Sequence, residues 1–187
     1  MPNHRKNARR QSVMVAFCGM AAALSVVVMM LGGVIPIATY AVPMICGTLL
    51  LPILIEFGKK AAWAAFFSVA LLSLILGFDK EAAFFYLFIG YYPIVKWPLD
   101  RVKPKGKRVL CKALLFSGTM VVMYLLLYLL FPMEDMVEDF REMGAALSIV
   151  FLIVYVACMF LYDRLLVQLL PLYANRVRPK FHFLMKR

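Results

Sequence analysis

Long apolar runs alternate with short polar connections along the whole chain. A helix needs about 20 apolar residues to cross the hydrocarbon core of a bilayer. Six runs are candidates, and they cover residues 13–34, 40–57, 61–78, 82–95, 109–131 and 143–170. The second run contains two prolines and the fourth is short and ends among prolines, so a five-span arrangement stays open. The pattern predicts an all-α membrane protein, a bundle of six transmembrane helices that forms one integral membrane domain over residues 1–187.

The composition excludes the main soluble classes of protein. Apolar residues make up 64% of the chain and charged residues 17%, whereas soluble domains contain about 45–50% apolar residues. A domain of this size exposes a large share of its surface, and that surface would be mostly hydrocarbon. A soluble enzyme, a disordered tail and a disulfide-stapled secreted module are therefore all excluded.

The charges predict the orientation in the membrane. The net charge is +11, and 19 of the 21 Lys and Arg residues fall in the cytoplasmic segments if the chain starts inside and crosses six times. Only Lys80 and Arg141 then lie outside, together with seven of the ten acidic residues. Because cytoplasmic segments are enriched in Lys and Arg, we expect a multi-pass protein of the cell membrane with both termini cytoplasmic. On this interpretation the basic residues face a lipid bilayer, and nucleic acid is not expected as a partner.

The sequence offers no catalytic or metal-binding set. The four cysteines lie in apolar runs without C-x-x-C spacing, and both histidines lie in the polar tails. No charge is expected near the midplane of a span, which argues against a carrier with its own ion relay. We therefore predict no enzymatic activity, no catalytic residues, no metal and no cofactor, so a transporter of this kind would need an energy source in a partner.

Small residues recur at four-residue spacing in the first and third predicted spans. Gly19 and Ala23 form one such pair, and Ala61 and Ala65 form another. Small-xxx-small spacing lets helix backbones approach closely. Each pair serves either packing within this chain or docking against another membrane protein.

Polar side chains in the predicted outer half of the bundle are candidates for lining a small-molecule pocket, because aromatic walls with a few polar groups suit an organic ligand. The candidates come from the second and the fourth to sixth spans: Tyr40, Glu81, Tyr86, Tyr124, Tyr128 and Ser148.

Residues 132–142 carry apolar side chains at helical spacing with acids on the other face, which predicts a short amphipathic helix that acts either as a lid or as a structural cap.

The chain resembles the substrate-binding S components of energy-coupling factor (ECF) transporters. The resemblance lies in the first predicted helix, VAFCGMAAALSVVVMM, in the alanine-rich third, and in the run YDRLLVQLL near the end of the sixth. It implies a transmembrane coupling subunit and two cytoplasmic ATPases as partners. It also implies docking through Gly19, Ala23, Ala61 and Ala65, and a pocket for a vitamin-like micronutrient that includes Tyr40, Glu81, Tyr124, Tyr128 and Ser148.

Two functional hypotheses follow. In the first, the protein captures a small micronutrient outside the cell and passes it to an ATP-driven partner complex. In the second, it is a scaffold of cell-envelope assembly that uses the same small-residue faces and binds no ligand. A cavity lined by Glu81, Tyr124 and Tyr128 would favour transport, and a filled core would favour the scaffold.

Overall fold

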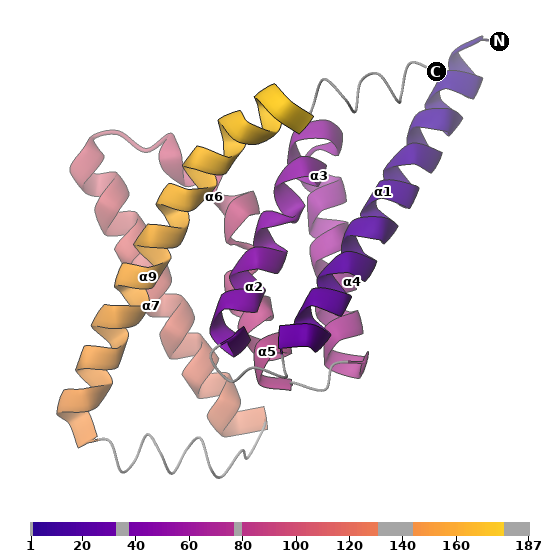
Figure 1. The fold of residues 1–187 in the computed structure, drawn as a ribbon. Helices are drawn as coiled ribbons and strands as arrows, with labels where there is room; N and C mark the ends of the chain where they lie inside the picture. Colours follow the sequence, from indigo (N-terminus) through magenta and orange to yellow (C-terminus); the bar gives the residue numbers. More distant parts are fainter. Residues whose placement is uncertain (1, 33–37, 77–79, 131–143, 178–187) are drawn as a thin grey trace. The chain divides into compact units, whose positions relative to one another are not determined.

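The computed structural model describes residues 2–32, 38–76, 80–130 and 144–177, and every regular element in these ranges is helical (Figure 1). The chain divides into two compact units: residues 1–96 with 172–187, and residues 97–171. The helices are α1 (Pro2–Gly32), α2 (Ala38–Thr48), α3 (Leu50–Phe57), α4 (Lys59–Leu76), α5 (Lys80–Ile89), α6 (Tyr92–Asp100), α7 (Lys105–Leu130) and α9 (Gly144–Leu172), followed by a π-helical turn, Tyr173–Val177. The predicted amphipathic segment 132–142 lies outside the described residues.

Three helical stretches are long and apolar enough to cross a membrane: Gln11–Gly32, Lys59–Leu76 and Ile149–Arg176. Only 22%, 39% and 17% of their most apolar stretches are buried within the chain. Their remaining apolar side chains, such as Ile75 with 76% of its surface exposed, require a non-aqueous environment. The all-helical fold is confirmed and these stretches indicate a membrane protein, whereas the six-span topology and the cytoplasmic termini stay predictions.

Each of the two predicted spans that contain prolines is broken into two helices. The second is divided at Leu49, whose N–H donates to Ile45 O at 3.3 Å and to Cys46 O at 3.2 Å. The fourth is divided after Gly90, whose N–H closes the last turn of α5 on Tyr86 O at 2.7 Å. In each case the next helix has a proline in its first turn, where the missing N–H costs no helical hydrogen bond.

The first unit has a core built on closely approaching helices. α1 packs on α4, and α2 packs on α5. The core combines alanines of α4, such as Ala62, with larger side chains, such as Ile53 of α3 and Phe66 of α4. Because alanine leaves room for the neighbouring backbone, the alanine-rich face of α4 is used for packing inside this unit.

Polar side chains within that core are bonded between helices. The Cys46 thiol of α2 donates to the Ser25 carbonyl of α1 at 3.4 Å. The Ser73 hydroxyl of α4 donates to the Met29 thioether of α1 at 2.8 Å. Hydrogen bonds of this kind hold helices together where the surrounding lipid supplies no hydrophobic drive.

The second unit consists of the end of α6, then α7 and most of α9. Phe116 of α7 and Phe160 of α9 make an edge-to-face contact, with ring centroids 5.4 Å apart and planes at 86°. Apolar residues on both helices are exposed, for example Leu114 and Leu161, each with 64% of its surface accessible. The buried side chains of this unit include a charged one, Lys112, whose ion pairs are described below.

Candidate functional site

The six predicted pocket residues are distributed over both units. Glu81 and Tyr86 lie on α5 and Tyr40 lies on α2, all in the first unit. The other three are in the second unit, Tyr124 and Tyr128 on α7 and Ser148 on α9. The side chains of Tyr40, Tyr124, Tyr128 and Ser148 lie outside what the structure describes, so a common pocket stays a prediction.

Of the two predicted pocket residues whose side chains are described, Tyr86 is the more deeply buried. None of its surface is exposed, and its ring stacks on Phe66 with centroids 5.4 Å apart. A Cβ added to Gly90 would lie 2.6 Å from that ring, so the glycine leaves the room that the tyrosine needs. The Tyr86 hydroxyl has no hydrogen-bond partner among the described residues, although the Cys46 thiol is close enough to interact with it electrostatically. A buried hydroxyl without a partner costs about 1–3 kcal/mol.

The position of Glu81 is explained by the helix that carries it. It lies in the first turn of α5 and is half-buried. A carboxylate at this position interacts favourably with the positive end of the helix dipole. No ligand is needed to explain why a carboxylate stands at this position. The buried Tyr86 hydroxyl has no comparable explanation.

The two predicted docking pairs have different surroundings. Ala61 and Ala65 are buried, with 8% and 3% of their surface exposed, and belong to the core of the first unit. Gly19 and Ala23 are exposed on α1, and a Cβ added to Gly19 would meet nothing within 4 Å. Within this chain the α4 pair is occupied by internal packing, and the α1 pair is accessible.

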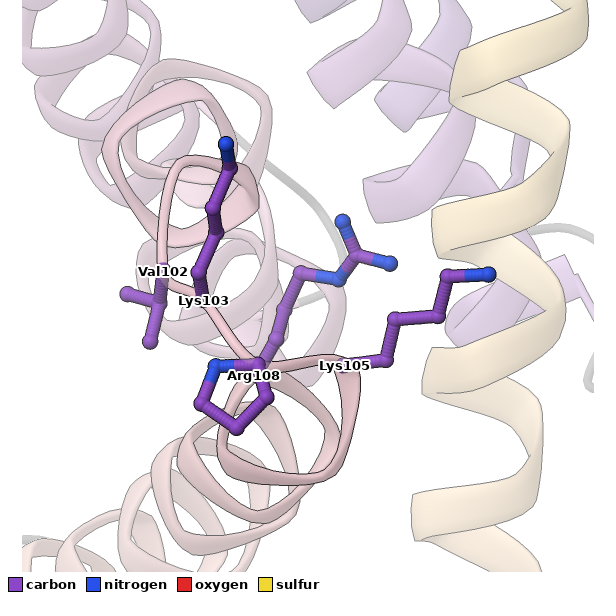
Figure 2. A pocket seen from close by; sticks show the side chains of 5 residues that line it. Val102, Lys103, Lys105 and Arg108 are labelled. Carbon is purple, nitrogen blue, oxygen red and sulfur yellow. The ribbon is translucent and has the colours of Figure 1, made fainter.

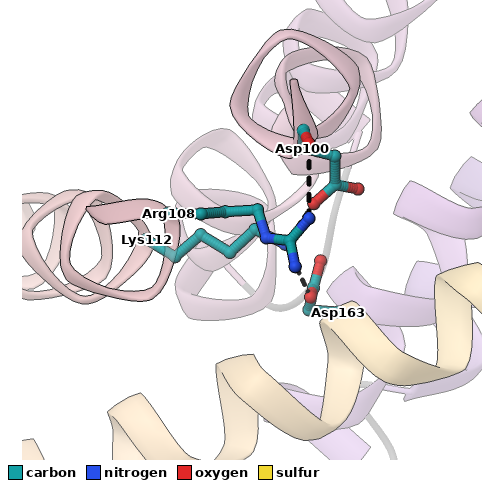
Figure 3. A network of polar contacts seen from close by, with 4 residues as sticks. All are labelled: Asp100, Arg108, Lys112 and Asp163. Carbon is teal, nitrogen blue, oxygen red and sulfur yellow. Dashed lines mark hydrogen bonds and ion pairs between the residues drawn. The ribbon is translucent and has the colours of Figure 1, made fainter. Parts of the chain in front are cut away.

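A buried ion network in the second unit was not predicted from the sequence (Figure 3). The Lys112 ammonium on α7 lies 2.6 Å from a carboxylate oxygen of Asp100 and 2.8 Å from one of Asp163 on α9. Arg108, one turn before Lys112, donates to the Asp100 carbonyl at 3.4 Å. The lysine is only 4% exposed, so its charge depends on these two partners. The sequence signal that could have predicted this network is Asp163 in the apolar run YDRLLVQLL, because a charged side chain in such a run requires a partner.

Next to this network, the turn between α6 and α7 surrounds an open hollow of ≈ 680 Å³ (Figure 2). Its lining consists of Val102, Lys103, Pro104, Lys105 and Arg108. In the view of Figure 2 the Arg108 guanidinium lies between the two lysine side chains. Three of the five lining residues are cationic and none is acidic, so the hollow suits an anion.

The described residues contain no group of three or more His, Cys, Asp or Glu side chains that could hold a metal ion. Comparison of the chain with family models, with curated proteins and with solved structures found no match. The function is therefore inferred from this chain's own residues.

Proposed function

We propose that the protein is a membrane-embedded binding subunit, similar to the S component of an ECF transporter, which captures a vitamin-like micronutrient and passes it to a transmembrane coupling subunit with two ATPases. In this proposal the chain crosses the membrane six times with both ends in the cytoplasm. The ligand binds in the outer half of the bundle, and the chain itself carries out no catalysis.

The observation that carries the proposal is the Tyr86 hydroxyl. It is completely buried without a hydrogen-bond partner among the described residues, at a position that the sequence pattern assigns to the pocket. Buried polar groups are nearly always satisfied by protein, water or a ligand. A small organic molecule with a hydrogen-bonding group would satisfy this hydroxyl and account for its unfavourable position in an apolar interior.

The ligand test starts from the full chain purified from its native membrane, with bound small molecules extracted and identified by mass spectrometry. We expect one compound in near-stoichiometric amount. The Tyr86→Phe variant, which removes only the hydroxyl, should bind the compound about 5- to 150-fold more weakly, the factor for a lost hydrogen bond of about 1–3 kcal/mol, and should retain correspondingly less of it. Tyr91→Phe is the matched control, because Tyr91 is half-buried and stacks on Trp63 at 6.5 Å. Equal retention by wild type and Tyr86→Phe would contradict the role of Tyr86.

The partner test uses the accessible pair on α1. Gly19→Leu introduces a bulky side chain where no atom lies within 4 Å of the new Cβ, so the fold should be unchanged. We expect loss of co-purification with the coupling subunit and ATPases. Gly118→Leu on α7 is the control, because Gly118 is also exposed and also has free space around it. Full assembly of the Gly19→Leu variant would refute docking through this face.

The scaffold of cell-envelope assembly is the second candidate. The observation that favours it is the packed core of the first unit, in which Ala61, Ala65 and Tyr86 all participate. A scaffold would copurify with envelope-assembly proteins, would contain no extractable small molecule, and would be unaffected by Tyr86→Phe. The two tests above therefore separate the candidates.

A further inference from the structure

The cationic hollow at the α6–α7 turn has a net positive charge that its immediate surroundings do not cancel. The closest acid in the sequence is Asp100, and its carboxylate is held by Lys112 at 2.6 Å. Lys103 and Lys105 are exposed, and Arg108 is half-buried. Lys112 is shared with a second carboxylate, that of Asp163, at 2.8 Å. The three cations of the hollow, the Lys112 cation and these two carboxylates together carry a net charge of +2, so an anion entering the hollow would meet an excess of positive charge.

The residues before and after the hollow in the sequence are exposed side chains of the types found at membrane interfaces. Trp97, five residues before Val102, has 40% of its surface exposed. Val109 and Leu110, directly after Arg108, are 52% and 60% exposed. Tryptophan is enriched at the level of lipid headgroups, and exposed aliphatic side chains mark the start of the hydrocarbon. The hollow therefore lies between an interfacial aromatic and the first lipid-facing turn of α7.

We propose that this hollow binds the phosphate group of an anionic phospholipid in the adjacent leaflet. The planar Arg108 guanidinium can donate two parallel hydrogen bonds to phosphate oxygens. Lys103 and Lys105 add positive charge at the rim, and Val102 and Pro104 provide an apolar wall for the glycerol backbone. Basic pockets at the ends of transmembrane helices are suited to such headgroups. The proposal is independent of a transported ligand, because it requires only that α7 enters the bilayer next to this turn.

Trp97 provides a local reporter for the test. The chain has two tryptophans, so Trp63→Phe leaves Trp97 as the only one. The full chain is placed in nanodiscs of phosphatidylcholine that contain the same minor fraction of dibrominated phosphatidylglycerol or dibrominated phosphatidylcholine. Brominated acyl chains quench tryptophan on contact. We expect phosphatidylglycerol to be preferred at least about fivefold, the contribution of one cation near a membrane surface.

The preference should depend on the residues of the hollow and not on the total charge of the protein. Lys103→Gln/Lys105→Gln/Arg108→Gln should bring the quenching ratio close to one. Lys59→Gln/Lys60→Gln should leave it unchanged, since these two exposed lysines begin α4 in the other unit. The double variant Lys103→Gln/Lys105→Gln keeps Arg108 and its hydrogen bond to Asp100, and it should lower the ratio without affecting the helical circular dichroism.

Each other result overturns the proposal. Equal quenching of the wild-type background by the two brominated lipids would show that the hollow does not select an anionic headgroup. An equal loss of preference in the Lys59/Lys60 control would assign the effect to overall charge. Abolition of the preference by millimolar inorganic phosphate at constant ionic strength would make a soluble anion the ligand.

Discussion

Replacing Lys112 by methionine tests the buried ion network of the second unit most directly. Methionine has a similar length, so the substitution removes the charge and leaves the packing volume nearly unchanged. Asp163 is only 13% exposed and Asp100 is 33% exposed, so the variant removes the Lys112 cation from a carboxylate in a mostly buried position.

The size of the effect follows from the distances. At an effective dielectric constant of about 20, a pair of unit charges 2.6–2.8 Å apart has an interaction energy of about 6 kcal/mol. Desolvation of the three ions offsets most of this attraction, and solvent screens the partly exposed Asp100. Removing one partner of a buried pair typically lowers the free energy of unfolding by about 3–5 kcal/mol, which is the loss we expect for Lys112→Met.

The assay is unfolding of the full chain in mixed micelles of dodecyl maltoside and sodium dodecyl sulfate, followed by circular dichroism. Lys107→Met is the control, because Lys107 is exposed on the same helix, and its effect should be within about 0.5 kcal/mol. The double variant Lys112→Met/Asp163→Leu should recover much of the lost stability, since it also removes the mostly buried carboxylate that Lys112 neutralises. A Lys112→Met variant as stable as wild type, or a double variant no more stable than Lys112→Met, would show that the network does not stabilise the second unit in this way.

Three further predictions concern close packing and topology. Gly32→Ala should lower the free energy of unfolding by about 1–3 kcal/mol, because its Cβ would lie 2.5 Å from Val42 Cγ2; Val42→Ala in the same chain should restore most of the loss in a micelle titration. Gly90→Ala should destabilise the first unit by a similar amount, since its Cβ would also lie 2.7 Å from a backbone oxygen, and wild-type stability would contradict this. In a variant with all native cysteines replaced by alanine, Lys103→Cys should react with an impermeant maleimide only from the cytoplasmic side and Lys80→Cys only from outside; labelling of both from one side would refute the six-span topology.

The sequence predicted the helices that are long and continuous. Apolar runs over 13–34, 61–78 and 143–170 correspond to α1, α4 and α9, because hydropathy alone decides whether such a stretch can cross lipid. α1 extends beyond its apolar run: the helix begins at Pro2, whereas its candidate membrane span begins at Gln11, close to the predicted start at residue 13. Its first turns contain Arg, Lys, Ala and Gln, which favour helix without contributing to an apolar signal.

The contacts between helices could not be predicted in the same way. Ala61 and Ala65 have a spacing that suits either a partner or a neighbouring helix, and only the packing of α4 in the first unit shows that they are buried there. The pairing of Lys112 with Asp163 joins residues 51 positions apart, a distance over which no local pattern operates. The depth of Tyr86 likewise depends on Phe66 and Gly90, which are supplied by a different helix and by a helix break.

In the six-span topology that we propose, the two helix breaks also constrain how the chain is inserted during synthesis. At about 1.5 Å per residue, α2, α3, α5 and α6 are each roughly half as long as the hydrocarbon is thick. A solitary half-length helix in lipid would leave terminal N–H and C=O groups without water or protein partners, at a cost of several kcal/mol each. Contacts from α1 to α2, from α3 to α4 and from α4 to α5 provide this shielding for α2, α3 and α5. In this topology we expect the translocation channel to release α2, α3 and α5 together with α1 and α4, so that these five helices enter the bilayer as a partly assembled body and not one helix at a time.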